Sequence, residues 1–278
     1  MFVAISPAKK LLEADSSAVS VEASKGLNFI NFKGASIPVT TPFFIEDAQL
    51  LNKLLLKFSE KNLTNLMKIS PKLAELNYQR YKEMFVAQEY ASALMFQGDT
   101  YQGLQVNTFS SEELIRSQEQ LRIISGLYGL LRPLDAINPH RLEVVTPLVT
   151  ERGKNLYNFW GSKPRDWLIK QMNSAGVNLI VNAASPAYAR TVFADEEGFE
   201  QAGIQIITPK FQDYSKGNYK VIGLFAKKAR GLMAKYIIQQ KVTSAEELAH
   251  FNLEGYEFDA AESTLNHPVF RRRNSRAA

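Results

Sequence analysis

The sequence predicts an α/β (α+β) fold, in which helices flank a central mixed β-sheet and a helical insertion covers about residues 43–88. Helical patterns separate short apolar runs of the kind that form buried strands, at 2–5, 93–96, 121–125 and 179–182. Two later apolar runs, at 204–208 and 219–225, are separated by a polar turn region at 215–218, as in an antiparallel hairpin. We therefore expect parallel and antiparallel strand pairs together.

The first third of the chain has two parts. Residues 15–40 read as a loop or small hairpin around Gly34. Beyond them, apolar residues at helical spacing predict a helix over 50–58, followed by a second over 61–67 and a third from Pro71 to about Phe85. We find no repeat or linker, and a chain of 278 residues with 45% hydrophobic content can bury one large core, so we expect a single domain over 1–278.

The turn between the second and third helices has the residues of a helix start. Ser70 suits the capping position and Pro71 the first helical position, where a missing N–H costs nothing. Two helices joined so tightly predict a helix-hairpin-helix, which offers a helix N-terminus to a DNA phosphate, and Lys68 and Lys72 flank the turn. Helix-hairpin-helix turns usually carry glycines and this turn has none, so a plain helical corner with solvated lysines is the alternative.

Composition excludes several classes of function. The sequence contains no cysteine, so disulfides, thiolate zinc sites and cysteine-ligated iron–sulfur clusters are excluded. The first residues carry neither the charged segment nor the long apolar run of a signal peptide, and no apolar segment approaches the length of a membrane span. We expect a cytoplasmic protein that does not bind membranes.

Positive charge is concentrated in one stretch. Seven basic residues and no acid lie between Asp213 and Glu246, although the whole chain has a formal charge of only +5. Such a local positive field attracts phosphates, and we assign backbone contacts with DNA to Lys227, Lys228, Arg230 and Lys235. The arginines at 271–273 and 276 form a tail to which we assign at most a non-specific electrostatic role.

Two near-identical segments follow predicted strands: Ser6-Pro7-Ala8-Lys9 and Ser185-Pro186-Ala187-Tyr188. If both strands lie in one parallel sheet, both turns face the crevice beyond its carboxyl edge, where α/β proteins bind ligands. Ser6, Lys9, Ser185 and Tyr188 would then share a pocket. Each segment also opens a probable helix, so two ordinary serine caps are the alternative.

Further polar and aromatic side chains follow the strands predicted at 93–96 and 121–125. Asp99 and Tyr101 follow the first, and Tyr128 and Arg132 follow the second, each among glycines that let backbone approach a ligand. We expect Lys9, Asp99, Tyr128 and Arg132 to converge on one crevice. No nucleotide-binding fingerprint is present. The aromatic segment with Tyr157 and Trp160 predicts base stacking or plain packing.

Taken together, these segments resemble the YaaA family of bacterial peroxide-stress resistance proteins. The segments that carry the resemblance run in order along nearly the whole chain, at residues 5–9, 98–104, 126–129, 131–135, 141–143, 155–157, 159–161, 226–231 and 255–258. The resemblance implies a mixed α/β fold with a helical insertion, a helix-hairpin-helix and a positively charged cleft that binds duplex DNA. It also implies that the protein protects DNA during hydrogen peroxide stress and helps to keep intracellular free iron low.

This chain departs from the family pattern at two turns. The turn at 182–188 lacks the acidic residue expected before Tyr188, which argues against a carboxylate role there. Proline stands at position 71 where family members can have aspartate, which removes a charge that would repel phosphate.

Two rivals to DNA binding remain. Direct iron storage would need paired Glu-x-x-His motifs, and only Glu247 with His250 matches, so we predict no metal site and no cofactor. An enzyme acting on nucleic acid, like a DNA glycosylase-lyase, would use Lys9 as nucleophile and Asp99 as its carboxylate.

We predict a protein that binds double-stranded DNA with little sequence preference. The sequence decides neither whether bent or branched duplexes are preferred nor the oligomeric state, for which a monomer is our expectation. Phosphates would contact Lys68, Ser70 and Lys72 at the hairpin as well as the four basic residues assigned above. The cleft would be lined by Ser6, Tyr101, Tyr128, Arg132, Arg141, Tyr157, Trp160, Ser185 and Tyr188.

Overall fold

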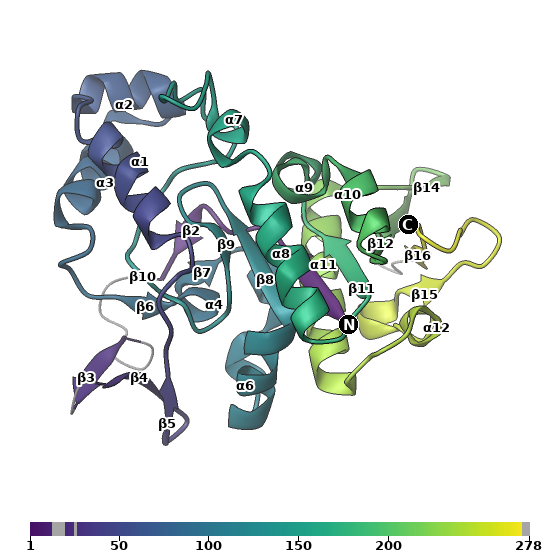
Figure 1. Cartoon of the computed structure of the whole chain (residues 1–278). Helices are drawn as coiled ribbons and strands as arrows, with labels where there is room; N and C mark the ends of the chain where they lie inside the picture. Colours follow the sequence, from purple (N-terminus) through teal and green to yellow (C-terminus); the bar gives the residue numbers. More distant parts are fainter. Residues whose placement is uncertain (13–19, 25–26, 274–278) are drawn as a thin grey trace.

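A computed structural model describes residues 1–12, 20–24 and 27–273 (Figure 1). Its centre is a five-stranded sheet in the order β12-β11-β1-β8-β9. The bounds of these strands are β1 Phe2–Ile5, β8 Leu121–Ser125, β9 Gly129–Leu131, β11 Leu179–Ala183 and β12 Gln205–Ile207. The first four strands in that order pair in parallel and β9 runs antiparallel to β8, so the sheet is mixed, as expected.

The middle strands β1, β8 and β11 are buried along their whole length because helices cover both faces of the sheet. Helices α8 and α9 lie on one face, and α11 and α6 lie on the other (Figure 1). The described part of the chain contains twelve α-helices, with bounds α1 Ile45–Leu55, α2 Glu60–Met67, α3 Pro71–Glu83, α4 Ser92–Met95, α5 Asp99–Leu104, α6 Ser111–Gln120, α7 Leu156–Trp160, α8 Lys163–Ser174, α9 Pro186–Phe193, α10 Glu196–Gln201, α11 Gly223–Gln240 and α12 Ala245–Leu248.

Smaller sheets lie at both ends of the molecule. Figure 1 shows α1 to α3 together at one end and a four-stranded sheet, in the order β14-β13-β16-β15, at the other. That sheet consists of β13 Lys210–Ser215, β14 Asn218–Lys220, β15 Glu257–Phe258 and β16 Val269–Arg272. A three-stranded sheet contains β3 Glu22–Ser24, β4 Leu27–Phe32 and β5 Ala35–Pro38, and two-stranded ladders join β2 Lys10–Leu11 with β7 Phe96–Gln97 and β6 Tyr90–Ala91 with β10 Ala136–Ile137.

Most elements lie where the sequence predicts them, and three differ. The apolar run at 93–96 is the short helix α4 followed by one residue of β7, because apolar runs this short do not separate a strand from a buried helix. The segment after Ser6 continues into β2 instead of a helix. The predicted strand at 219–225 ends at Lys220, and its hairpin partner is β13, which follows β12.

The helices α5 and α11 cross with almost no side chain between them. A Cβ atom built on Gly103 would lie 2.8 Å from the backbone nitrogen of Leu232, and one on Gly231 would lie 2.7 Å from that of Leu104. Glycine at both positions therefore lets the two backbones touch. This contact places the start of α5 beside the basic helix α11, next to the carboxyl edge of the central sheet.

Candidate functional site at the carboxyl edge of the sheet

The two Ser-Pro turns meet at the carboxyl edge of the central sheet. Strands β1 and β11 are parallel neighbours, with Ile5 opposite Ala183, so the residues that follow them emerge side by side. Ser6 Oγ lies 3.2 Å from Ser185 Oγ and accepts a hydrogen bond of 2.8 Å from the Ser185 backbone N–H. Ser6 Oγ thus pairs with the backbone N–H of the residue just before α9, and the Ser185 side chain makes no capping hydrogen bond to its own helix.

A carboxylate with two cations lies next to these serines. Lys9 Nζ lies 2.7 Å from one oxygen of Glu143, and Arg141 donates a 3.0 Å hydrogen bond to the other. The Lys9 side chain is 64% exposed, whereas that of Glu143 is only 20% exposed. The cluster carries a net charge of +1, and its lysine is the member that solvent and a ligand can reach.

The loop that carries Arg141 and Glu143 is fixed by close backbone packing. A Cβ on Gly126, just after β8, would lie 3.0 Å from the backbone nitrogen of Val144, so only glycine lets the loop approach this closely. Trp160 is buried and donates a 3.0 Å hydrogen bond to the Gly126 carbonyl. The helical insertion holds the same loop from the other side, because the Tyr81 hydroxyl of α3 donates to the Arg141 carbonyl.

A cavity of about 20 Å³ lies among Lys9, His140, Glu143 and Tyr188. This volume holds about one water molecule. A sugar or a base would therefore bind at its rim, where the exposed amine of Lys9 lies, unless the loop moves.

The two tyrosines of this edge are neutral. Tyr101 is buried and donates a 3.3 Å hydrogen bond to the Ser6 carbonyl, and burial raises its pKa well above 10. Burial also raises the pKa of Tyr188, and the nearby Glu143 carboxylate adds to the effect. Both hydroxyl groups keep their protons at neutral pH, so neither tyrosine supplies a phenolate.

His140 belongs to this site although the sequence did not single it out. Its ring is buried against Tyr128 at 5.1 Å and Phe96 at 6.1 Å between centroids, and burial lowers its pKa to about 4. Nδ1 lies 2.9 Å from the Asn138 carbonyl, which can only accept, so Nδ1 carries the proton and Nε2 is an acceptor. One signal was available in the sequence: His140 directly precedes the Arg141–Glu143 motif.

Several predicted cleft residues lie elsewhere. Tyr128 is buried behind His140, where its hydroxyl accepts a 3.4 Å hydrogen bond from the Asn138 N–H. Arg132 follows β9, which runs antiparallel to β8, so it lies beside Arg122 at the amino edge of the sheet and pairs with Asp135 at 3.2 Å. The prediction that both share one crevice with Lys9 is therefore wrong.

Asp99 and the aromatic segment lie near the site with other partners. Asp99, at the start of α5, lies 3.8 Å from Lys227, so the carboxylate partner of Lys9 is Glu143 and not Asp99. Tyr157 donates a 3.0 Å hydrogen bond to the Ala187 carbonyl at the start of α9, and its ring lies 4.6 Å from the Arg190 guanidinium. Of the aromatic pair, Trp160 packs in the core and Tyr157 stays half-buried at the edge.

The turn between α2 and α3 presents a second group of candidate residues. Lys68 ends α2 in the left-handed conformation, with φ of 51°, and Ser70 Oγ accepts a 3.3 Å hydrogen bond from the Leu73 N–H at the start of α3. Lys68, Ser70 and Lys72 are all exposed, and the first turn of α3 contains no acid. Two helices joined by a short basic turn are present.

Most basic side chains assigned to DNA on helix α11 already have partners within the protein. Lys228 lies 2.5 Å from Glu254, Lys227 lies 3.8 Å from Asp99, and Lys235 donates a 2.6 Å hydrogen bond to Gln105. These partners come from distant parts of the sequence, so a local scan for acids could not find them. Arg230 differs, because it is half-buried and has no carboxylate partner in the described part of the chain, and burial lowers its pKa.

Two of the arginines after Phe270, Arg271 and Arg272, are structural. Arg271 and Arg272 lie in β16, where they pair with Asp259 at 2.6 Å and with Asp213 at 2.7 Å, and the Arg272 guanidinium lies 4.4 Å from the Tyr256 ring. The charges of these two residues are therefore paired within the protein, whereas the sequence indicated at most a non-specific electrostatic role for them. Position 276 lies outside the described residues.

Within residues 1–12, 20–24 and 27–273, no three His, Cys, Asp or Glu side chains are placed to hold a metal ion. None of the helices described is both long enough and apolar enough to cross a membrane.

Comparison with known proteins shows the family of this chain. A family described as peroxide stress protein YaaA matches residues 1–262. A UPF0246 protein of Aliivibrio fischeri is 44% identical over 237 residues, which cover 84% of this chain and 90% of that protein. One from Shewanella pealeana is 40% identical over 258 residues, which cover 91% of this chain and 98% of that protein. The chain is thus a member of the peroxide stress protein YaaA family, also called UPF0246.

Proposed function

We propose that this protein binds duplex DNA and through this binding protects DNA and helps to keep intracellular free iron low during peroxide stress. The family name supports the peroxide part of the proposal. The observation that carries the DNA part is the exposed turn between α2 and α3, where Lys68 and Lys72 flank the start of a 13-residue helix whose first turn contains no acid.

The start of α3 has the chemistry of a phosphate site. Pro71 has no N–H and the N–H of Leu73 is taken by Ser70, so the amide of Lys72 is the donor left to a ligand. The positive end of the helix dipole adds to the charges of the two lysines. Contacts of this kind neutralise phosphates without reading bases, so the binding should depend on salt and hardly on sequence.

The test is a titration of labelled duplexes of different sequence at several salt concentrations, followed by fluorescence anisotropy. The double variant Lys68→Ala/Lys72→Ala should weaken binding equally for every duplex. It should also flatten the dependence of log K on log salt by roughly 0.9 per lost contact, about 1.8 in total.

A matched control is available in the same hairpin. Lys61 lies in the first turn of α2 and Lys82 near the end of α3, so Lys61→Ala/Lys82→Ala removes the same charge away from the turn. If the control weakens binding as much as the test variant, the turn has no special role. Unchanged binding in the test variant would also refute the proposal.

The Lys9 cluster supports a second candidate, a lyase that acts on abasic DNA. The observation in its favour is the 2.7 Å contact between the exposed Lys9 amine and Glu143, beside two serines at the carboxyl edge. The amine must lose a proton before it attacks the sugar aldehyde, and Glu143 is placed to receive it.

Borohydride reduction of a mixture with abasic duplex would convert a Schiff base into a stable covalent band. The lyase candidate requires a band that is lost in Lys9→Ala and retained in Lys10→Ala, which removes the neighbouring exposed lysine. The absence of a band under conditions of full DNA binding would exclude this candidate and leave DNA binding untouched.

A further inference from the structure

The outer edge of the central sheet is open at one residue. Strand β12 is an edge strand that pairs in parallel with β11. On the side that faces β11, the Gln205 N–H donates a 2.9 Å hydrogen bond to the Asn178 carbonyl. Because successive residues of a strand alternate in direction, the N–H and C=O of Ile206 face away from the sheet. Neither group has a partner in the described part of the chain.

Both ends of this outer edge are occupied. The Ile204 N–H donates a 2.9 Å hydrogen bond to the Phe199 carbonyl, and the Thr208 N–H donates one of 2.8 Å to the Asn266 carbonyl. Between them, Ile206 has a backbone donor and acceptor that no described residue pairs with. Edge strands with unpaired backbone groups are sites where an extended segment can add a strand.

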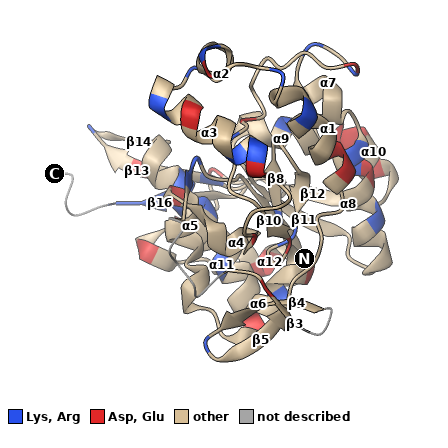
Figure 2. Ribbon diagram, turned by 90° about the vertical axis from the view of Figure 1, so that its left-hand side faces the viewer, with Lys and Arg blue, Asp and Glu red and all other residues tan. Residues whose placement is uncertain are grey.

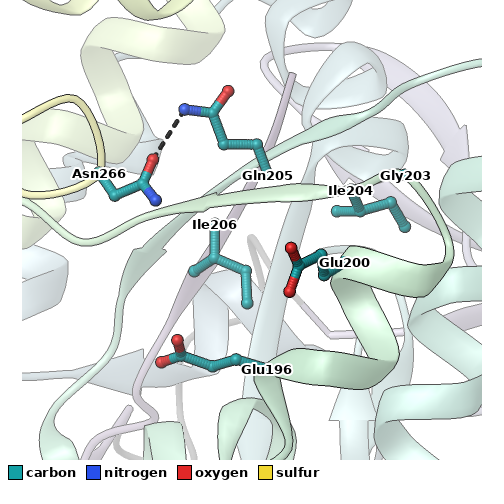
Figure 3. A pocket seen from close by; sticks show the side chains of 7 residues that line it. All are labelled: Glu196, Glu200, Gly203, Ile204, Gln205, Ile206 and Asn266. Atoms are coloured by element: carbon teal, nitrogen blue, oxygen red, sulfur yellow. Dashed lines mark hydrogen bonds between the residues drawn. The ribbon is translucent and has the colours of Figure 1, made fainter.

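A cavity of about 450 Å³ lies beside this opening (Figure 3). In Figure 3 the Ile206 side chain lies between Glu196 and Glu200 of α10, and the Gln205 and Asn266 side chains meet on the far side through a 2.8 Å hydrogen bond. The cavity thus combines an apolar contact from Ile206, two carboxylates and the open backbone.

No cation of the described residues pairs with the carboxylate of Glu196 or Glu200. Among their acidic neighbours in sequence, Asp195 pairs with Arg165, and Glu197 accepts a 2.9 Å hydrogen bond from Gln201. Glu196 and Glu200 are exposed and have no ion-pair partner in the described residues, and acidic residues stand out on α10 in Figure 2. Like charges four residues apart destabilise a helix, and a bound cation would remove that cost.

We propose that this edge binds an extended basic segment of a partner protein. The backbone of the segment would pair with Ile206, and two basic side chains would contact Glu196 and Glu200. The spacing agrees: residues four apart on a helix are separated by about 6 Å along its axis, and alternate residues of a strand by about 6.6 Å. Two lysines or arginines at positions i and i+2 therefore match the two glutamates.

A second copy of this chain fits the edge poorly. Pairing two copies edge to edge would bring the glutamates of one copy toward those of the other, and like charges oppose such pairing. The cavity shares no lining residue with the Lys9 cavity, and none of its residues belongs to the α2–α3 turn or to α11. Binding here is therefore independent of the DNA contacts proposed above.

The experiment uses a fluorescein-labelled peptide, Lys-Val-Lys-Val-Lys, titrated with the full chain at low salt. We expect saturable binding, which the double variant Glu196→Gln/Glu200→Gln weakens by about tenfold, as expected for the loss of two ion pairs. The matched control is Glu197→Gln on the same helix, outside the cavity, and it should change the affinity by less than about twofold. A peptide N-methylated at its three middle residues should bind at least about tenfold more weakly, because it cannot donate to the edge.

Four results of the peptide titrations would overturn the proposal. They are no binding up to about 1 mM peptide, equal loss of affinity in Glu197→Gln, equal binding of Glu-Val-Glu-Val-Glu, and unchanged affinity of the N-methylated peptide. Sedimentation that reveals a dimer disrupted by Ile206→Pro, which removes the outward N–H, would instead assign the edge to a second copy and would also refute it. Circular dichroism of each variant checks that it is folded.

Discussion

Replacing Gly231 by alanine should disrupt the crossing of α5 and α11. The added Cβ would lie 2.7 Å from the Leu104 backbone nitrogen and closer still to the Thr100 carbonyl oxygen. Both obstacles are backbone atoms, which cannot turn aside as a flexible side chain can. The helices must therefore separate by more than about 1 Å in an interior that is packed like a crystal.

Overpacking of this kind typically destabilises by about 1–3 kcal/mol, and a clash with backbone on both sides belongs at the upper end. For a chain of this size, about 3 kcal/mol corresponds to a decrease in melting temperature of about 6–12 °C. Urea denaturation followed by tryptophan fluorescence measures the loss directly, since Trp160 and Trp167 are both buried. Because α5 also carries Tyr101 to the Ser6 carbonyl, the carboxyl edge should lose order with it.

Gly223 provides the matched control on the same helix. A Cβ at this position meets nothing within 4 Å, so Gly223→Ala should be neutral or stabilising by up to about 1 kcal/mol through helix propensity. If Gly231→Ala unfolds at the same urea concentration as the original protein, the helices are not as close as described and the reasoning is refuted.

Three further predictions concern single groups. Burial lowers the pKa of His140 to about 4, below its unfolded value of about 6.5, so proton binding favours the unfolded chain. The free energy of unfolding should therefore decrease as the pH falls from about 6.5 toward 4. A pH series in which the His140→Gln variant shows the same decrease would contradict this. Ser70→Ala removes the cap of α3 and should cost about 1 kcal/mol in urea denaturation, whereas equal stability would mean that the cap is not formed in solution. Arg230→Ala should lower the slope of log K for duplex binding against log salt by about 0.9, and Lys228→Ala should lower it less, because Glu254 already neutralises Lys228. The reverse order would place the DNA contact elsewhere on α11.

The strands and long helices could be predicted because local patterns decide them. Buried parallel strands need continuous apolar runs, and the runs at 2–5, 121–125 and 179–182 form the buried strands β1, β8 and β11. Ser70 with Pro71 marked the start of α3 for an equally local reason. The run at 93–96 was misread because four apolar residues fit a buried helix as well as a strand.

The meeting of Ser6 with Ser185 could also be predicted, because parallel strands deliver their carboxyl ends to one edge and both serines follow such strands. The same reasoning failed for Arg132, because the sequence does not reveal that β9 turns back antiparallel to β8. One reversed strand moved this side chain to the opposite edge.

The sequence by itself determined the positions of the buried strands and the long helices, the absence of thiol chemistry, and the family. The tertiary structure decided which charges form ion pairs: Lys9 with Glu143, Lys228 with Glu254 and Arg272 with Asp213. Within the described residues, it also left Glu196 and Glu200 without an ion-pair partner. The physical reason is range, since hydrophobic periodicity is set by neighbours in sequence, whereas an ion pair is set by a distance of a few ångströms between residues that the fold alone brings together.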